Sequence, residues 1–138
     1  MEEITAFLKA LTPESEAGLG TSLFKIPRFP FRVGRESRIG QNQFFADSRR
    51  QPNSVPNNDL YLIDTAPLMN ISREHFQIEL RDGNFFLVDR RSVCGTLVEG
   101  VIVGRDRAGG EKPLKNGDVI IVGSSESRHV FKFVCNER

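Results

Sequence analysis

The chain has 138 residues, a length typical of a single domain that buries a hydrophobic core without disulfides or metal ions. Its 19 lysines and arginines almost balance its 18 aspartates and glutamates, so no long-range charge attracts nucleic acid or an anionic membrane. The two cysteines, Cys94 and Cys135, form neither a disulfide framework nor a set of metal ligands. We therefore expect reduced thiols, no metal and no cofactor.

The N-terminus has no feature of export or membrane insertion. Residues 1–3 are acidic where a signal peptide would be basic, and no apolar run reaches membrane-spanning length. The sequence thus predicts a soluble, cytoplasmic domain that binds neither nucleic acid nor membrane and is a monomer in isolation.

Residues 2–11 have the spacing of a short amphipathic helix. Apolar side chains recur there at Ile4, Phe7, Leu8 and Leu11. Pro13 ends the pattern, and residues 13–20 are small and polar, as in a connector. We predict a helix and connector over residues 1–20, packed on the flank of a main domain that spans residues 21–138.

From residue 21 onward, short apolar runs alternate with turn residues, which is typical of strands. In residues 75–80 the apolar side chains alternate with polar ones, and Asp82-Gly83 then gives a hairpin signal before a returning strand at 85–89. Further runs of this kind are 23–26, 29–33, 60–63, 96–98, 101–103, 119–122 and 130–134. The pattern predicts an all-β sandwich or barrel of about ten to eleven short strands.

Two stretches have the composition of long loops. Residues 36–57 are rich in Arg, Gln, Asn, Ser and Pro, and residues 104–112 are charged and contain two adjacent glycines. Loops of this length in a compact domain are usually functional or disordered. We predict that the loop at 36–57 lies near a binding edge.

Five short motifs follow one another along the expected strands. They are Gly34-Arg35, Asn58-Asp59-Leu60, Ser72-Arg73-Glu74-His75, Ser92-Val93-Cys94-Gly95-Thr96, and Leu114-Lys115-Asn116-Gly117-Asp118-Val119-Ile120. In this order they resemble the forkhead-associated (FHA) domain, whose pattern is Gly-Arg, Asn-Asp-Ile, Ser-Arg-x-His, Asn-Gly-Thr and Leu-x-x-Gly-Asp-x-Ile. The resemblance covers about residues 21–134. It implies a two-sheet, FHA/SMAD-like β-sandwich that is not an enzyme and binds a threonine-phosphorylated segment of a partner protein.

The resemblance assigns phosphate contact to Arg35 and Ser72, with Arg73 assisting. The chemistry is suitable, because a phosphothreonine carries a charge of about −1.5 to −2 and three strong acceptor oxygens. A guanidinium fork and a small hydroxyl donor, held on rigid loops, match such a group. We expect Gly34 to let the backbone bend sharply just before Arg35.

Other residues of the motifs are expected to support the site or to read the peptide. The resemblance implies that His75 braces the binding loops, and Gly95 and Thr96 belong to the same structural support. Asn70 stands where FHA domains read the third residue after the phosphothreonine. The amide of Asn70 would favour a polar or acidic residue at that position of the peptide only weakly.

The motif before Gly95 departs from the family pattern. FHA domains usually have asparagine at the position of Cys94, where its amide pairs with the peptide backbone, and threonine or serine at the position of Val93. A thiol is a weak donor and acceptor, so losing one or two such bonds costs roughly 1–3 kcal/mol of affinity. Glu99 likewise replaces a common second asparagine. We expect Val93 and Cys94 to border the peptide with altered contacts.

Three alternatives remain at this point. The departures are compatible with an FHA fold that binds its partner without phosphate. An enzyme would use Cys94 or Ser72 as nucleophile and His75 as base, although no catalytic signature is present. The third alternative is a nucleotide-binding module of the PilZ type, because residues 89–95 resemble its Asp-x-Ser-x-x-Gly motif. However, the spacing from Asp89 to Ser92 is one residue too long for that motif, and the Arg-x-x-x-Arg that precedes it in PilZ modules is missing.

Overall fold

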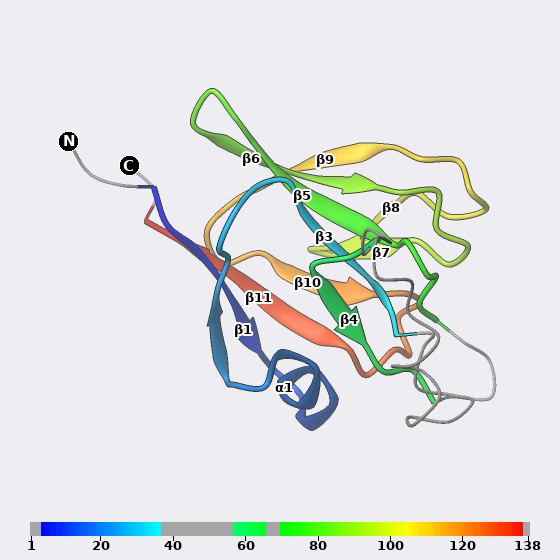
Figure 1. Ribbon diagram of the computed structural model, residues 1–138. Coiled ribbons are helices and arrows are strands. Elements are labelled where there is room, and N and C mark those ends of the chain that lie inside the picture. Colours follow the sequence, from blue (N-terminus) through cyan, green and yellow to red (C-terminus); the bar gives the residue numbers. More distant parts are fainter. Residues whose placement is uncertain (1–3, 37–56, 66–69, 137–138) are drawn as a thin grey trace, which may run out of the picture.

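The computed structural model describes residues 4–36, 57–65 and 70–136. The strands are β1 Ala6–Ala10, β2 Leu23–Lys25, β3 Phe31–Arg35, β4 Leu60–Leu62, β5 Phe76–Arg81, β6 Asn84–Asp89, β7 Thr96–Val98, β8 Val101–Val103, β9 Glu111–Leu114, β10 Val119–Val122 and β11 Val130–Cys135, and the helix α1 is Pro13–Leu19. They form a six-stranded sheet in the order β2-β1-β11-β10-β7-β8 and a five-stranded sheet in the order β4-β3-β5-β6-β9 (Figure 1). This confirms the expected all-β sandwich.

The core lies between the two sheets. Inward-facing side chains alternate along the strands, so that Phe131 and Phe133 of β11 are buried on one sheet and Phe76 and Ile78 of β5 on the other. The rings of Phe85 and Phe133 meet edge to face across the sheets, with centroids 5.0 Å apart. Packing of both inner faces therefore holds the sheets together.

The N-terminal prediction is wrong in its placement. The expected helix over residues 2–11 is instead the strand β1, which pairs with β2 and β11 inside the six-stranded sheet. Within β1, Ala6 and Leu8 are buried, which is the period of a strand, whereas Ile4 and Leu11 of the supposed helical stripe are exposed. The helix lies in the stretch that was read as a connector.

Local signals explain why α1 begins at Pro13. Thr12 caps the helix, since its hydroxyl accepts a hydrogen bond from the backbone N–H of Ser15 and the Ser15 hydroxyl accepts one from the backbone N–H of Thr12. Proline at the first helical position starts a helix as readily as it ends one. Gly20, with φ of 78°, closes the C-terminus in the left-handed conformation.

All nine predicted strands are present, each with ends within about two residues of the expected ones. The hairpin between β5 and β6 turns at Asp82 and Gly83, whose φ angles of 50° and 81° fit a type I′ turn. Strand β9 was not predicted, because its first two residues fall in the charged stretch 104–112 that was read as a loop. It contains Pro113, which is tolerated because β9 lies at the edge of its sheet. Residues 37–56 of the predicted long loop lie outside the described residues.

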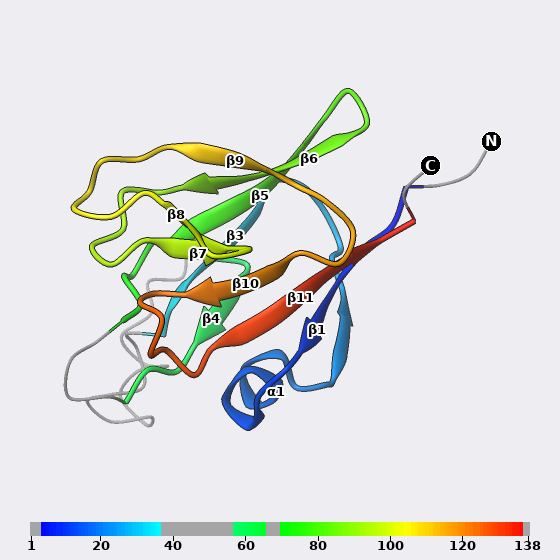
Figure 2. The same ribbon diagram turned by 180° about the vertical axis from the view of Figure 1, so that it is seen from behind.

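One end of the sandwich gathers the connections that carry the motifs. The end of β3, the segment before β5, and the loops β6–β7 and β8–β9 all lie there, on the left in Figure 2. The termini of the described chain lie at the other end, where the backbone N–H of Thr5 donates to the side chain of Asn136 at 2.8 Å. Within the described ranges, no helix has the length and apolar character needed to cross a membrane.

Candidate functional site

Arg35 is the last residue of β3 and is fixed against the segment before β5. Its backbone N–H donates to the carbonyl of Ser72 at 2.9 Å, and its side-chain Nε donates to the carbonyl of Ile71, also at 2.9 Å. Arg35 is half-buried and its side chain is held through Nε, so the arginine fork is oriented before any ligand arrives.

Ser72 links two of the loops. Its hydroxyl oxygen accepts a hydrogen bond from the backbone N–H of Val93 in the β6–β7 loop at 3.0 Å. Its own backbone N–H donates to Nδ1 of His75, again at 3.0 Å. A hydroxyl that accepts one hydrogen bond still has its proton to donate, so Ser72 remains able to donate to an anionic oxygen.

His75 is fully buried and connects the segment before β5 with the β6–β7 loop. Because Nδ1 accepts from Ser72, the ring proton of the neutral imidazole is on Nε2, which lies 2.7 Å from the carbonyl oxygen of Gly95 and donates to it. Burial lowers the pKa of His75 below its ordinary value, although the hydrogen bond to Gly95 acts in the opposite direction. The histidine is therefore a neutral crosslink between the loops.

The prediction of a sharp bend at Gly34 is wrong, because this residue lies within the regular strand β3. What requires glycine is close approach. A Cβ at Gly34 would overlap the carbonyl oxygen of Arg73 and press on the side-chain amide of Asn58. That amide donates to the same Arg73 carbonyl at 2.7 Å. Strand β3, Asn58 and the segment before β5 are therefore packed so closely that no side chain fits at position 34.

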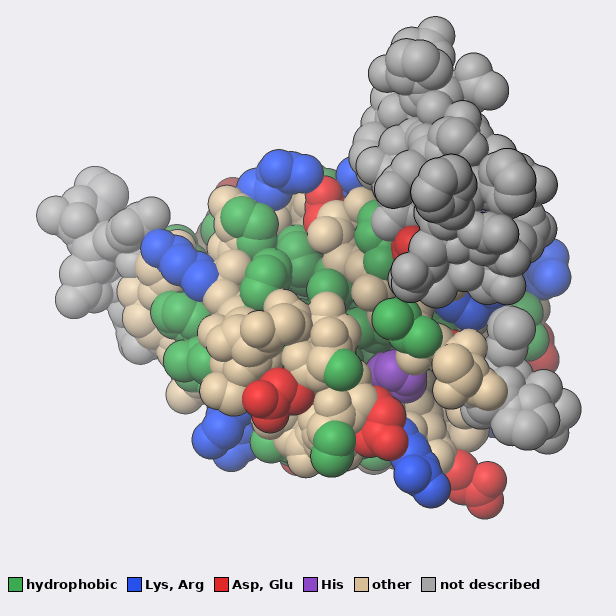
Figure 3. Space-filling view, turned by 60° about the horizontal axis from the view of Figure 1, so that its bottom comes forward, with side chains coloured by type: hydrophobic (Ala, Val, Ile, Leu, Met, Phe, Trp, Pro, Cys, Tyr) green, Lys and Arg blue, Asp and Glu red, His purple; other side chains and the backbone are tan. Residues whose placement is uncertain are grey.

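These elements surround a hollow of about 590 Å³ that is strongly basic. Five arginines and a single acidic residue contribute to its lining: Arg35, Arg73, Arg90, Arg91, Arg107 and Glu74. The whole chain has a formal net charge of only +1. On the face shown in Figure 3, acidic and basic side chains lie scattered among uncharged ones. Positive charge is thus concentrated in this hollow, as a local anion site requires.

The five arginines are not equivalent. Arg90 is a structural brace: it donates to the side-chain oxygen of Asn58 at 2.7 Å and to the carbonyl of Asn57 at 3.0 Å, and it lies 3.7 Å from Glu74. Burial lowers the pKa of Arg90 below its ordinary value. Arg73, Arg91 and Arg107 are exposed at the hollow.

The neighbouring motif residue Asp59 has a structural role. Arg28 and Arg32 both bind its carboxylate, at 2.7 Å and 3.2 Å. Although burial raises the pKa of Asp59, hydrogen bonds from Arg32 and Arg28 lower it to about 2. The ion pairs fix the start of β4 against β3.

Of the six residues predicted to contact the phosphopeptide, the structure brings Arg35, Ser72, Arg73 and Val93 to the basic hollow and leaves Cys94 and Asn70 outside its lining. Cys94 lines an adjoining, mainly apolar hollow of about 470 Å³ together with Val93, which borders both. Asn70 lines a third hollow and accepts a hydrogen bond from the Ser124 hydroxyl at 2.8 Å.

Gly95 is the last residue of the β6–β7 loop, and Thr96 is the first residue of β7. Gly95 has φ of 77°, a conformation that favours glycine, and its carbonyl accepts from His75 and from the backbone of Gly123. Thr96 is buried, and its hydroxyl has no hydrogen-bond partner among the described residues.

The sequence motifs did not point to Arg90, Arg91 and Arg107. The first two directly precede the Ser92 motif, so a basic pair beside a binding loop was a usable local signal. Arg107 lies in a charged loop that only the folded topology brings to the hollow, and no local pattern distinguishes it.

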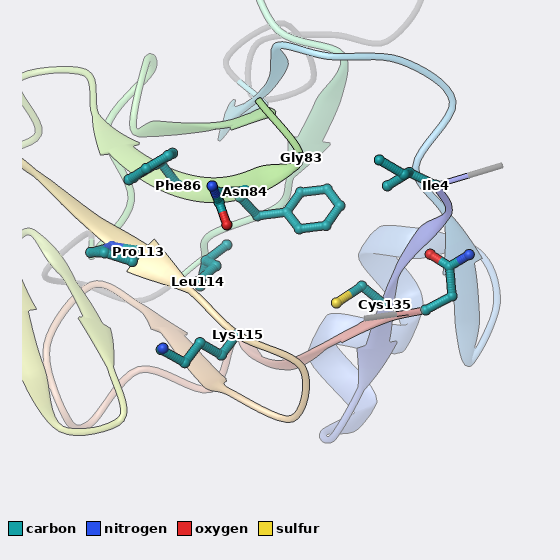
Figure 4. Close-up of a pocket in the computed structure, with 10 residues that line it drawn as sticks. Ile4, Gly83, Asn84, Phe86, Pro113, Leu114, Lys115 and Cys135 are labelled. Atoms are coloured by element: carbon teal, nitrogen blue, oxygen red, sulfur yellow. The ribbon is translucent and has the colours of Figure 1, made fainter. Parts of the chain in front are cut away.

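Another hollow, of about 520 Å³, lies at the opposite end of the sandwich. Phe86, Pro113 and Leu114 lie on one side of it, and Ile4 and Cys135 on the other (Figure 4). This hollow shares no residue with the basic one. Among the residues that the structure describes, no group of three or more histidines, cysteines or carboxylates is placed to hold a metal ion.

Comparison with solved structures shows the same fold in known FHA domains. The FHA domain of the CT664 protein from Chlamydia trachomatis is 19% identical, with a TM-score of 0.56 over 94% of this chain and 96% of that chain. The kinase-interacting FHA domain of the kinase-associated protein phosphatase KAPP from Arabidopsis is 19% identical, with a TM-score of 0.61 over 100% and 98%. EmbR from Mycobacterium tuberculosis is 18% identical, with a TM-score of 0.57, and the match covers 97% of this chain but 25% of EmbR.

A search of curated proteins found no match. The family model of the FHA domain matches residues 31–123, which is more than half of the chain and includes the basic hollow and all five sequence motifs. The chain therefore belongs to the FHA domain family, whose members are protein–protein interaction modules that generally bind phosphopeptides.

Proposed function

We propose that this protein binds a phosphothreonine in an extended segment of a partner protein and acts as an adaptor, without catalysis, in cytoplasmic signalling or in the regulation of secretion. The observation that supports this most is the coupling of Arg35 and Ser72 at a basic hollow. A backbone hydrogen bond of 2.9 Å joins the two residues directly, so a guanidinium fork and a hydroxyl donor are held together.

In the proposed complex the phosphate enters the basic hollow. Arg35 and the Ser72 hydroxyl donate to its oxygens, Arg73 assists, and the threonine methyl packs on loop atoms. Val93 and Cys94 border the peptide, and Asn70 remains a candidate for contacting the third peptide residue after the phosphothreonine. EmbR, a structural relative, was solved in complex with a low-affinity phosphopeptide, which supports this direction.

The geometry of Ser72 argues against the nucleophile reading. His75 contacts the backbone N–H of Ser72 and not its hydroxyl, which instead accepts from Val93. An activated serine needs its hydroxyl hydrogen-bonded to the base. His75 is also fully buried, so it is poorly placed to exchange protons with a substrate.

Phosphate-independent binding is the second candidate, and the apolar hollow beside Cys94 favours it. Val93 and Ile102, which line it, are each 48% exposed. An apolar partner residue could bind there without any phosphate. This candidate differs from the first in one respect that is easy to measure, because it does not need Arg35.

The deciding experiment uses three degenerate peptide libraries with a fixed central phosphothreonine, threonine or phosphoserine. Selective capture of the phosphothreonine library is expected, and Arg35→Ala and Ser72→Ala should each abolish it. Arg128→Ala is the matched control, since Arg128 is 80% exposed and lies outside the basic hollow. Equal capture of all three libraries that survives Arg35→Ala would instead establish the phosphate-independent candidate, and capture of none would contradict both.

A further inference from the structure

The segment that carries Arg107 has an unusual backbone. Gly104, Arg105, Asp106 and Arg107 have φ angles of 81°, 94°, 56° and 62°, so four consecutive residues are left-handed. In this conformation the Cβ of an ordinary residue crowds the following carbonyl oxygen. Such backbone persists only where the surroundings enforce it, and it is concentrated at functional sites.

Hydrogen bonds clamp this segment onto the β6–β7 loop. The backbone N–H of Asp106 donates to the carbonyl of Val93 at 2.8 Å, and that of Arg107 donates to the carbonyl of Ser92 at 2.9 Å. Val93 in turn donates to the hydroxyl of Ser72. Arg107 is therefore held in a fixed relation to Ser72, although the two residues are 35 positions apart in the sequence.

Arg91 reaches the same hollow from another strained position. Its φ is 65°, and its backbone N–H donates to the carboxylate of Asp89 at 2.9 Å. The same carboxylate accepts from the backbone and hydroxyl of Ser92. Two different loops thus each use left-handed backbone to bring an arginine to one hollow.

The basic hollow holds more positive charge than one phosphate needs. A phosphothreonine brings about two negative charges at most, which Arg35 and Arg73 can match. Arg90 is tied to Asn57, Asn58 and Glu74. In the described ranges, the side chains of Arg91 and Arg107 have no acidic or hydrogen-bonding partner, and both are exposed.

From this we infer that Arg91 and Arg107 form a second anion-binding position beside the phosphate position, so that the preferred partner segment has another negative group close to its phosphothreonine. The inference rests on the proposed function. Phosphate and carboxylate share the pair of anionic oxygens that a guanidinium fork binds bidentately, so a second phosphorylated residue or an Asp or Glu would fit.

The test uses degenerate peptides with a central phosphothreonine and one further fixed position, moved from three residues before to three after it. The fixed residue is alanine, glutamate or phosphoserine. Affinities are measured for the unmodified chain and for Arg107→Gln, Arg91→Gln and Arg105→Gln. Arg105 is the matched control, because it shares the left-handed segment with Arg107 but lines the apolar hollow and faces Asp106 at 3.9 Å.

We expect glutamate or phosphoserine, at one or two positions, to improve the affinity of the unmodified chain about three- to ten-fold over alanine. Arg107→Gln and Arg91→Gln should bring this ratio close to one, whereas Arg105→Gln should preserve it. Improvement with phosphoserine alone identifies a second phosphate as the ligand, and improvement with both identifies any acidic residue.

The inference is overturned if alanine, glutamate and phosphoserine peptides bind equally, or if Arg107→Gln and Arg91→Gln leave the ratio unchanged. Binding of the alanine set that is lost in Arg35→Ala would then still support the proposed function. Absence of binding by every phosphothreonine set would contradict the proposed function and the inference together.

Discussion

Gly34 and the carbonyl oxygen of Arg73 approach so closely that a single methyl group between them would change the site. Gly34→Ala is expected to lower the free energy of unfolding by about 1–3 kcal/mol, since backbone atoms on both sides must shift to admit the Cβ. The displaced loop carries Ser72 and Arg73, so phosphopeptide affinity should fall as well. Urea unfolding and calorimetric titration measure the two effects.

The matched control is Gly18→Ala in α1. A Cβ there would lie 2.7 Å from the end of the buried Leu62 side chain, which must shift, but it meets no backbone atom, and alanine is the better helix former by about 1 kcal/mol, which partly offsets the contact. Gly18→Ala should therefore destabilise the protein less than Gly34→Ala does. A Gly34→Ala variant as stable as the unmodified chain would show that the close approach is not needed.

The helix α1 depends on its cap more than on its seven residues, because so short a helix is marginal by itself. Thr12→Ala removes the hydroxyl that accepts from the Ser15 N–H and donates to the carbonyl of Arg128. We expect a loss of about 0.5–2 kcal/mol in the free energy of unfolding. Thr12→Ser, which keeps the hydroxyl, should lose much less, and equal losses in the two variants would contradict the role of the cap.

The same region shows what a sequence pattern can and cannot predict about an element. Strands with clear alternation were predicted because burial on one face determines their sequence. Strand β1 was read as a helix because Ile4, Phe7, Leu8 and Leu11 match helical spacing by chance, and only pairing with β11 distinguishes the two. Edge strand β9 has little apolar content to reveal it.

In the candidate site, too, some residues could be predicted from the sequence and others could not. Arg35, Ser72 and His75 belong to short motifs whose order resembles the FHA pattern, and this resemblance predicted that the three residues come together. Arg91 and Arg107 converge through long-range topology, and the near-neutral total charge conceals how much positive charge the fold gathers in one hollow. A local site can be strongly basic in a chain that is not.

The stability of the whole molecule should depend on pH through its two buried histidines. Burial lowers the pKa of both His75 and His129, whereas an unfolded histidine has a pKa of about 6.5. The unfolded chain thus binds more protons than the folded one as the pH falls below about 6.5. The stabilisation is fully present above that pH and is lost as the pH falls toward the lower pKa values of the folded state.

Each histidine adds at most about 1.4 kcal/mol per pH unit to the slope of the unfolding free energy. We expect stability to fall between pH 7.5 and 5.5, and His129→Gln and His75→Gln each to reduce the slope. Asp59 does not interfere in this window: its pKa of about 2 is lowered from an unfolded value near 3.9, so its stabilisation is lost only as the pH falls below about 4. Urea unfolding of the unmodified chain and both variants measures the slopes. A flat profile would mean that the folded protein accommodates both protonated rings, and that the hydrogen bond from Ser72 to Nδ1 of His75 does not hold the loops.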